Sequence, residues 1–581
     1  MMRMRQIAPW LLLFAFGCDS TDSNVPPGGP PPVSGGTLHV SADGRWAIAS
    51  DPDRAAIHVV DLDARSEVHR LDLGADDEPG RAVEDMAGRF HVVLRRAGEV
   101  LTLDPPSGTV VERRKVCASP RGIDLDSANG ELVVACAEGL LARLPVTGGA
   151  VRTVAIEPDL RDVVVHEASG RVLVSVFRSA EILVLEDDAV VSRMVPPTSD
   201  ISDIFGSPRT WSPSVAWRMR EHPEGAILVH QHSVSTQLGT LGVPSGVYYG
   251  GDCTLGVVRS AVSIASIETG TVETAALSDT ARFGNGVSLA VDVDFTGDLI
   301  YTASAAEPNV PVDDYSYGSF TGVRSFGADG MDETAPCAQA YAPSTAPAGA
   351  TIAVANVPGR GIIAQYRDPA RLVLVASGDA IPLSGGSAAN IGHSIFHEAV
   401  GTGATCASCH PEGGDDGRVW RFDVGARRTQ TMRGGILATL PFHWAGDVPT
   451  GTGVMEGTFV GRMGATAMPL GYEIDAFESW VDALPALPGV AHDGSAVDRG
   501  RAIFERADCG SCHAGSLGTN NETVDVGTGG AFQVPALYEL AYRGPYLHDG
   551  RAATLVDAVR MHTEGLSEAE QADVAAYLRS R

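Results

Sequence analysis

Two copies of one short pattern in this sequence could hold a redox cofactor. They are Cys406-Ala-Ser-Cys409-His410 and Cys509-Gly-Ser-Cys512-His513. The C-x-x-C-H pattern is typical of covalent haem c attachment. Two thiols about one helical turn apart can add to the two vinyl groups of one porphyrin, and the next imidazole can then bind the iron. The sequence therefore predicts two covalently bound haem c groups (iron), with His410 and His513 as metal ligands.

Two other uses of paired cysteines fit this sequence less well. A zinc ribbon places its C-x-x-C pairs about 15–20 residues apart, whereas Cys409 and Cys509 are 100 positions apart. A thioredoxin-like redox pair lies near a βαβ pattern, and no such pattern surrounds either motif. Haem attachment is therefore the favoured interpretation.

Helices are expected to position both motifs. Residues 392–396 lead to Cys406 and residues 500–504 lead to Cys509, each with the pattern of an amphipathic helix. A second helix closes each copy, over residues 476–484 and 567–578, and the latter begins with a Ser567/Glu570 capping box. This repeat predicts two mainly α cytochrome c domains, over residues 385–488 and 489–581.

The chain before residue 385 carries a different repeat. From residue 37, short β-rich runs alternate with turns at first about 40 residues apart, the period of a four-stranded propeller blade. Seven turn glycines mark the units: Gly44, Gly88, Gly130, Gly170, Gly225, Gly297 and Gly361. We therefore expect an all-β, seven-bladed propeller over residues 37–384. It resembles the YVTN/lactonase-like propellers of exported bacterial proteins.

The later units contain polar, Tyr/Gly-rich insertions, including residues 248–253 and 311–317. Binding sites often form on long loops of a rigid scaffold. The propeller is therefore expected to dock a redox partner protein or a small-molecule substrate. The alternative is that these insertions pack against the haem domains as a lid.

The composition excludes several classes of protein. The chain has 581 residues, with 43 Lys and Arg against 72 Asp and Glu, for a formal charge of −29. This acidic balance argues against a nucleic-acid partner, and 44% hydrophobic residues argue against whole-chain disorder. No internal apolar run approaches the roughly 20 residues of a membrane-spanning helix.

The N-terminus has the pattern of an export signal. Residues 1–17 combine two arginines with a short apolar run, and Ala15-Phe16-Gly17-Cys18 resembles a bacterial lipobox, in which Cys18 is lipidated. Plain secretory cleavage is the alternative. The polar, Pro/Gly-rich residues 18–36 are expected to form a tether. The prediction is an envelope lipoprotein, periplasmic or on the cell surface, that meets the membrane only through its lipid.

Four further cysteines remain, and their even number in an oxidising compartment suggests two disulfides. Cys117 and Cys136 form the natural local pair. Cys253 and Cys337 would form the second, and buried free thiols are the alternative for them.

Segments that follow each C-x-x-C-H motif are similar to those of a known family. In the second domain they are Phe532-Gln-Val-Pro-Ala-Leu, Arg543-Gly-Pro-Tyr-Leu-His548-Asp-Gly550 and Thr554-Leu-Val-Asp-Ala-Val. In the first they are Arg428-Thr-Gln-Thr-Met and Pro441-Phe-His443-Trp444-Ala-Gly446. The C-terminal third thus resembles the di-haem cytochrome c peroxidase / MauG superfamily.

The resemblance implies candidates for the distal iron ligands. In the second domain the family's ligand position corresponds to His562, with Met561 beside it; His562 would give a lower-potential centre than Met561. In the first domain the candidates are His443 and Met463. His548 is expected in a tight turn and not as a ligand.

The same resemblance raises the question of catalysis. The family's peroxidatic haem relies on a Gln and a Glu where this chain has Val454 and Gly464. Glu456 and Arg462 are the nearest candidates, and O–O cleavage needs a positioned acid or base. We therefore favour an electron-transferring di-haem cytochrome over a peroxidase that reduces H2O2 at the first haem. A propeller that binds or senses a ligand while the haems report redox state is the third alternative.

Overall fold

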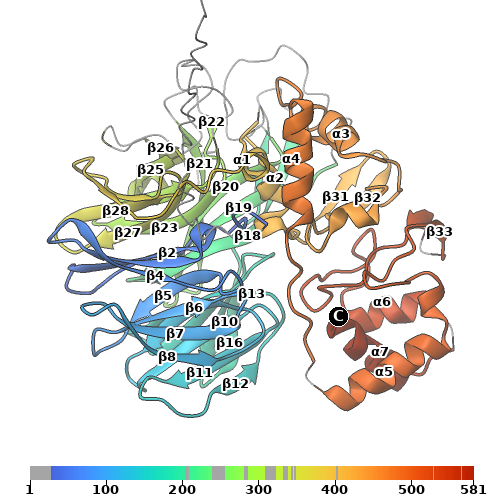
Figure 1. Cartoon of the computed structure of the whole chain (residues 1–581), viewed down its shortest axis with the longest axis horizontal. Helices are drawn as coiled ribbons and strands as arrows, with labels where there is room; N and C mark the ends of the chain where they lie inside the picture. The colour runs from blue at the N-terminus through green and yellow to red at the C-terminus, as the bar shows by residue number, and fades with distance from the viewer. Residues whose placement is uncertain are drawn as a thin grey trace, which may run out of the picture.

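The computed structural model describes residues 28–33, 35–202, 208–237, 256–279, 285–307, 322–331, 338–341, 345, 349–400, 403–491, 493–527, 529–563 and 565–581. A β-propeller precedes a helical C-terminal region that lies beside it (Figure 1). Cys18, Cys253 and Cys337, and the predicted signal peptide, lie outside the described residues. Within those residues, no helix has the length and apolar content needed to cross a membrane.

Seven sheets form the blades. The first blade contains β1 (Leu38–Val40), β2 (Trp46–Asp51), β3 (Ala56–Asp61) and β4 (Ser66–Asp72), and the second contains β5 (Pro79–Glu84), β6 (Phe90–Leu94), β7 (Glu99–Asp104) and β8 (Thr109–Lys115). The third contains β9 (Pro120–Asp126), β10 (Glu131–Cys136), β11 (Leu140–Pro145) and β12 (Arg152–Ala155). The fourth contains β13 (Leu160–His166), β14 (Arg171–Val176), β15 (Ile182–Glu186) and β16 (Ala189–Met194). The last three comprise β17 (Ser199–Ser202), β18 (Pro208–His222), β19 (Gly225–Val234), β20 (Val258–Ser266), β21 (Val272–Asp279), β22 (Asn285–Gly286) with β26 (Ala338–Ala340); β23 (Ala290–Thr296), β24 (Leu299–Ser304), β25 (Gly322–Gly327); and β27 (Thr351–Val357), β28 (Gly361–Tyr366), β29 (Arg371–Leu374), β30 (Ala380–Pro382). The strands pair antiparallel except for the parallel pair of β21 and β26 in the fifth blade.

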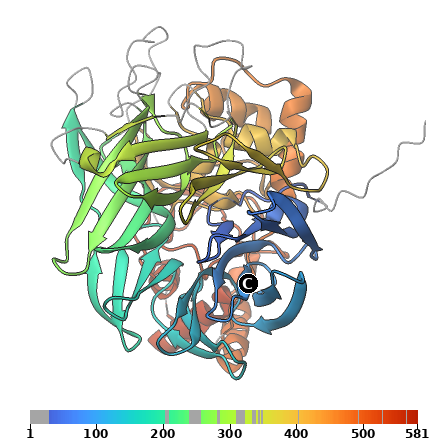
Figure 2. The same cartoon turned by 90° about the vertical axis from the view of Figure 1, so that its left-hand side faces the viewer.

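The repeat of turn glycines corresponds to the blades. Each of the seven predicted glycines lies in the hairpin between the inner strand of a blade and the next strand, with φ between +57° and +150°. The inner strands contact one another in order around the axis, from β5 through β9, β13, β18 and β23 to β27. Figure 2 shows the blades with the helical region behind them. The predicted seven-bladed propeller is confirmed.

The ring closes through side chains, because the first and last blades share no strand. Leu38 and Leu62 of the first blade pack with Leu372 of the last. At the same junction Arg54 donates to Asp368 at 2.6 Å. Closure therefore depends on a packed apolar seam and buried polar contacts.

The C-terminal region consists of two mainly helical units, as predicted. The first contains α1 (Ile391–His397), α2 (Cys406–Cys409), the hairpin β31 (Val419–Phe422) and β32 (Gly425–Arg428), α3 (Gly451–Val454), the π-helix η6 (Met455–Val460) and α4 (Gly471–Asp482). The second contains α5 (Gly494–Arg506), η7 (Cys509–Ser511), the hairpin β33 (Thr523–Asp525) and β34 (Ala531–Gln533), α6 (Leu555–His562) and α7 (Glu568–Arg579). The capping box at Ser567 and Glu570 is confirmed.

The two helical units attach to the propeller differently. The first shares one apolar cluster with blades five to seven, which joins Phe396 and Trp480 to Trp217 and Ile352. The second has a cluster of its own, centred on α5, α6 and α7. The first unit is thus an extension of the propeller core, and the second is an adjoining domain.

The described part of residues 18–36 is packed on the fold, which corrects the prediction of a tether there. The Trp480 indole donates to the Pro30 carbonyl at 2.9 Å, and Arg367 donates to that of Val33 at 2.7 Å. A Cβ at Gly29 would lie 2.9 Å from Asn390. These contacts hold the segment against α4 and the last blade, so the described residues of 28–36 are packed.

Candidate functional site

The first C-x-x-C-H motif lies against the propeller. Thr405 caps α2, whose two cysteines are partly buried. Cys406 packs against the cluster shared with the propeller, and Cys409 packs with Trp211 of β18 and Trp420 of β31. The propeller therefore forms part of the wall of the first site.

The second motif belongs to a separate core. Cys509 follows α5, packs against the cluster around Phe504 and Val559, and begins the short helix η7. In both motifs the cysteines are free thiols. Burial raises the pKa of the Cys406 thiol to about 12, whereas redox-active C-x-x-C pairs need a lowered pKa. This thiol is unlike that of a redox disulfide.

The two motif histidines are oriented alike. His410 Nδ1 lies 3.2 Å from the Gly414 carbonyl oxygen, and His513 Nδ1 lies 2.9 Å from that of Gly518. A carbonyl can only accept, so each Nδ1 carries the proton and each Nε2 keeps its lone pair. This is the usual second contact of a metal-binding histidine, and the residues fit a haem ligand at both sites.

A second imidazole faces His513. The rings of His513 and His562 have centroids 6.2 Å apart. Two imidazoles that bind one metal from opposite sides through bonds of about 2 Å have centroids about 6 Å apart. Met561 precedes His562 in α6, and both side chains are exposed, so the ring pair with His513 is the observation that separates them. The geometry favours His562 over Met561.

A sequence signal for this choice exists. Leu555, Val559 and His562 follow an i, i+4, i+7 spacing and share one face of α6. Leu555 and Val559 are buried in the core of the domain, so His562 is directed to the same side. Successive helix residues point about 100° apart, which turns Met561 away.

The distal side of the first site is built differently. Within the described residues, no imidazole faces His410 as His562 faces His513. Arg462 stacks over Phe422, whose ring packs in the cluster that holds Cys409. Burial and then the charge of Arg462 lower the pKa of half-buried His443, although the adjacent carboxylate opposes this shift. The charge of Arg462 thus acts on His443.

The remaining candidates lie on or after the π-helix η6. Met463 is partly buried and packs against the same apolar cluster as Cys406, whereas Glu456 is exposed. Short π-helical segments often mark functional sites. Met463 and His443 both remain predictions for the first distal ligand, as do Glu456 and Arg462 for an acid–base role.

Comparison with known proteins identifies the last part of the chain. Residues 497–581 match the family model described as cytochrome c. The chain therefore ends in a cytochrome c domain. Such a domain carries covalently bound haem c and transfers electrons, and the matched residues include Cys509, Cys512 and His513. No curated protein sequence matches the chain.

Solved structures resemble parts of the chain. A structure of Kuenenia stuttgartiensis hydrazine synthase is 12% identical, with a TM-score of 0.44, over 61% of this chain and 97% of that chain. The virginiamycin B lyase of Staphylococcus aureus is 9% identical, with a TM-score of 0.38, over 58% and 92%. Both TM-scores lie below 0.5.

Arg428 of the first helical unit contacts the cytochrome c domain. The backbone N–H of Arg428 donates to the His548 carbonyl of that domain at 2.6 Å. The carbonyl of Arg428 accepts from the indole of Trp444, in its own unit, at 2.7 Å. His548 is buried, stacks on Phe532 with centroids 3.8 Å apart and meets Trp444 edge-on. His548 is thus a packing residue of the domain boundary, in a position that fits the expected turn.

A carboxylate that the sequence analysis did not single out joins the first motif to the propeller axis. Glu412, two residues after His410, is 3% exposed. It accepts from Arg161 of β13 at 2.9 Å and pairs with Arg95, which follows β6. Although burial opposes it, the charges of Arg161 and Arg95 hold the pKa of Glu412 well below its ordinary value. Charge complementarity therefore holds the segment after the first C-x-x-C-H motif against the propeller.

Asp415 makes a second junction of this kind. It is 1% exposed and accepts from Arg178 of the fourth blade at 3.1 Å and from Arg428 at 2.8 Å. Burial raises the pKa of this carboxyl, but Arg178 and Arg428 outweigh that effect and lower it to about 2. No sequence pattern predicts these ion pairs, because the carboxylates and the arginines of the propeller are far apart along the chain.

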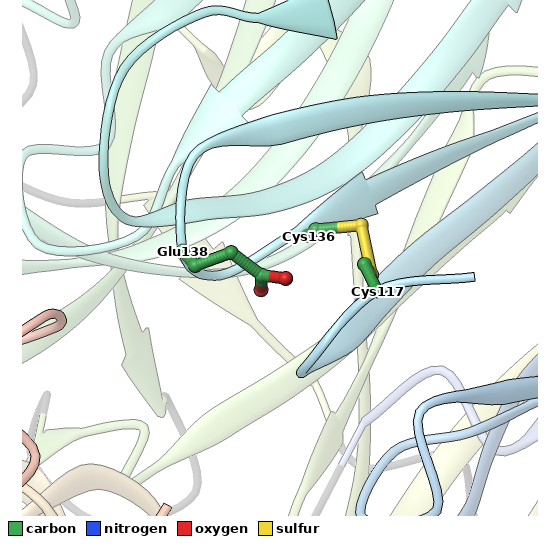
Figure 3. Close-up of side chains that lie close together, drawn as sticks. All are labelled: Cys117, Cys136 and Glu138. Carbon is green, nitrogen blue, oxygen red and sulfur yellow. A yellow bond between two sulfur atoms is a disulfide. The ribbon is translucent and has the colours of Figure 1, made fainter. Parts of the chain in front are cut away.

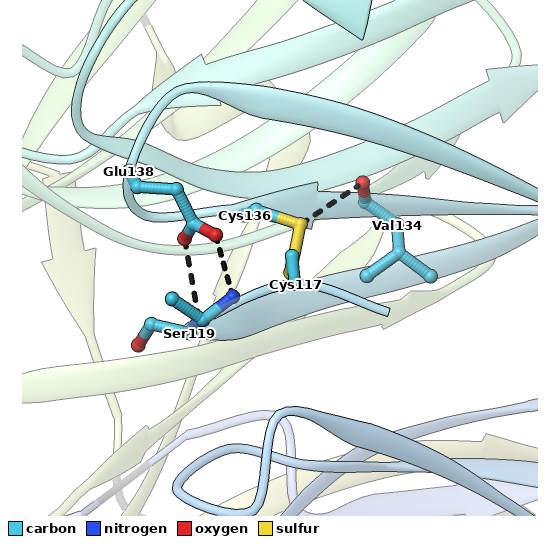
Figure 4. The surroundings of a disulfide bond; sticks show 6 residues. Cys117, Ser119, Val134, Cys136 and Glu138 are labelled. Carbon is cyan, nitrogen blue, oxygen red and sulfur yellow. Dashed lines mark hydrogen bonds between the residues drawn. A yellow bond between two sulfur atoms is a disulfide. The ribbon is translucent and has the colours of Figure 1, made fainter. Parts of the chain in front are cut away.

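The third blade contains the local disulfide. Cys117 and Cys136 are bonded (Figure 3). The Glu138 carboxylate lies beside them and accepts from the backbone N–H groups of Ala118 and Ser119 at 2.6 and 3.2 Å (Figure 4). Both sulfurs and the carboxylate are thus already engaged, so this cluster is structural and not a metal site.

Removing this disulfide is expected to destabilise the propeller. The cysteines are 19 positions apart, and closing a loop of that length stabilises a fold by about 3 kcal/mol. The double variant Cys117→Ser/Cys136→Ser should lose about that much in denaturant unfolding. Iodoacetamide should label neither residue in the unreduced, denatured wild type. An unchanged unfolding midpoint, or labelling of both cysteines, contradicts this expectation.

Proposed function

We propose that this protein is an exported di-haem c-type cytochrome that transfers electrons. The observation that carries the proposal is the pair of C-x-x-C-H motifs whose histidines, His410 and His513, both hold Nδ1 against a backbone carbonyl and leave Nε2 for iron. The cytochrome c domain supports the second haem. The same donor set at Cys406, Cys409 and His410 supports the first.

At each centre, different residues would attach the porphyrin, orient the imidazole and bind the iron. When bound, haem iron supplies one-electron chemistry. The cysteines hold the porphyrin, Gly414 and Gly518 fix the imidazole orientation, and His562 completes the second centre. A second side-chain ligand limits access of small molecules to the metal and favours electron transfer.

The stoichiometry of haem tests this proposal. Protein matured in a host that attaches haem c should contain two haems per chain by pyridine haemochrome assay. Cys409→Ala and Cys512→Ala should each lower the ratio to one. Cys512→Ala should also unfold much of 489–581, because the core of a small haem domain packs on the porphyrin. An unchanged ratio in either variant, or a haem-free wild type, overturns the proposal.

A peroxidase is the second candidate function, favoured by the first site. No imidazole faces His410 within the described residues, and the charge of Arg462 acts on His443. The resemblance to the di-haem peroxidase / MauG superfamily supports the same activity, in which Glu456 or His443 would move protons and Arg462 would stabilise negative charge during H2O2 reduction. A high-spin spectral fraction that shifts with cyanide or peroxide supports it. Two wholly low-spin, ligand-inert haems exclude it.

Export and docking belong to the same proposal. Haem c is attached outside the bacterial cytoplasm, which supports the signal peptide and lipidation of Cys18 in a periplasmic or surface lipoprotein. A redox partner or substrate would use a propeller surface away from the axis, because Glu412 enters the axis. Mass measurement of the mature N-terminus tests lipidation: an unmodified Cys18 contradicts it.

A further inference from the structure

The axis of the propeller contains a small chamber lined by arginines. Its volume is about 10 Å³. Four arginines of the inner strands and their flanking turns line it, all between 3% and 6% exposed: Arg81, Arg95, Arg121 and Arg161. Its other lining residues are Gly35 and Gly80, so no carboxylate borders it directly.

The packed N-terminal segment borders the chamber. Gly35 belongs to this segment, and its N–H donates to the Ile352 carbonyl at 3.0 Å. A second cavity of about 30 Å³ shares Arg121 and Arg161 with the chamber and is bordered by Glu412 of the segment after the first C-x-x-C-H motif. The two cavities therefore adjoin at Arg121 and Arg161.

Three of the four arginines have a carboxylate partner. Arg161 and Arg95 pair with Glu412, and Arg95 Nε also lies 3.3 Å from Glu78. Arg81 Nε lies 3.4 Å from the carboxylate of Asp162, which also forms an ion pair with Arg218. The surplus of charge in this group is therefore positive.

Arg121 is the exception. Within the part of the chain that the structure describes, its guanidinium makes no hydrogen bond or ion pair, although only 6% of the residue is exposed. Burial, and next the charge of Arg95, lower its pKa to about 9. The charges of Glu412 and Glu78 offset this effect only in part. A buried charge without a hydrogen-bonded partner is strongly destabilising, and arginine is rarely relieved of that cost by losing its proton. A counter-ion is the remaining means of compensation.

We propose that the chamber binds one small monoatomic anion of the chloride class against the guanidinium of Arg121. A volume near 10 Å³ holds about one water-sized particle, so a monoatomic anion fits it better than phosphate or sulfate. A water molecule would fit the space and would leave the charge uncompensated. The anion would stabilise the place where three inner strands meet the N-terminal segment.

Thermal unfolding of the haem-loaded protein tests the proposal. At constant ionic strength, replacing gluconate with chloride should raise the unfolding temperature of the wild type until the site saturates, because a ligand that binds only the folded state stabilises it. Arg121→Met should lose this chloride dependence. Arg143→Met is the matched control, since Arg143 is also buried but pairs with Asp126 and Asp188 at 2.9 and 2.7 Å; it should keep the dependence.

A second measurement tests the proposal without relying on the folding of Arg121→Met. Wild-type protein purified with bromide as its only halide should give an anomalous scattering peak beside Arg121 in a crystal structure. A wild type whose unfolding temperature is the same in chloride and gluconate overturns the proposal. So does a chloride effect that persists in Arg121→Met, or a bromide-grown crystal with no peak in the chamber.

Discussion

Replacing His562 with alanine is expected to convert the haem of the cytochrome c domain from low-spin to high-spin. The ring of His562 faces that of His513 at a centroid distance of 6.2 Å, which fits two imidazoles on one iron. Loss of one of them leaves an open coordination position. The absorption and EPR spectra of the oxidised variant should therefore gain a high-spin component of one haem per chain, and that haem should then bind cyanide.

Met561→Ala is the matched control for this experiment. Met561 lies next to His562 in α6, and its side chain points about 100° away from that of His562, so its loss should leave the spectrum unchanged. His562→Met should restore a low-spin haem and raise its midpoint potential, on the order of 100 mV, because a thioether favours the reduced iron. If Met561→Ala shifts the spectrum and His562→Ala does not, the ligand is the methionine. If neither variant differs from the wild type, the distal ligand lies elsewhere.

The second large effect is expected from Glu412→Gln. This carboxylate is 3% exposed and is the shared partner of Arg95 and Arg161. Removing one side of a buried ion pair leaves the other charges uncompensated and typically costs about 3–5 kcal/mol. Denaturant unfolding of the haem-loaded protein, followed by far-UV circular dichroism, should show a loss of that size in the transition that includes the propeller and the first helical unit.

Two further variants separate this effect from a general loss of charge. Glu505→Gln removes an exposed carboxylate of α5 and should change stability by less than about 0.5 kcal/mol. Adding Arg95→Met to Glu412→Gln should recover part of the loss, because it removes one of the unpaired charges. An unfolding midpoint of Glu412→Gln equal to that of the wild type shows that the pair contributes nothing measurable.

The distal ligands illustrate how far sequence reasoning reaches. The spacing after Thr554 limited the choice to two neighbours, Met561 and His562, and the helical periodicity of Leu555, Val559 and His562 could have decided it. In the first unit no comparable periodicity exists, because η6 interrupts the helix before Met463. A π-helix changes the direction of the side chains that follow it, so spacing alone cannot orient them.

The N-terminal segment illustrates the opposite case. Its composition indicated a tether, yet the described residues of 28–36 pack against Trp480 and Arg367. Composition describes what a segment can do in isolation. A groove formed by two distant elements can still order it, since proline and glycine lose little side-chain entropy on burial.

Features that depend on neighbouring residues could be predicted from the sequence. Haem attachment requires five consecutive positions, the seven hairpins require a residue that tolerates positive φ, and the capping box requires Ser567 and Glu570 three positions apart. Tertiary structure alone decided which charges meet. Glu412 pairs with arginines 251 and 317 positions away, and Arg121 is left without a partner at the same axis. Such pairs form where blades converge, and contacts between distant segments leave no periodic trace in the chain.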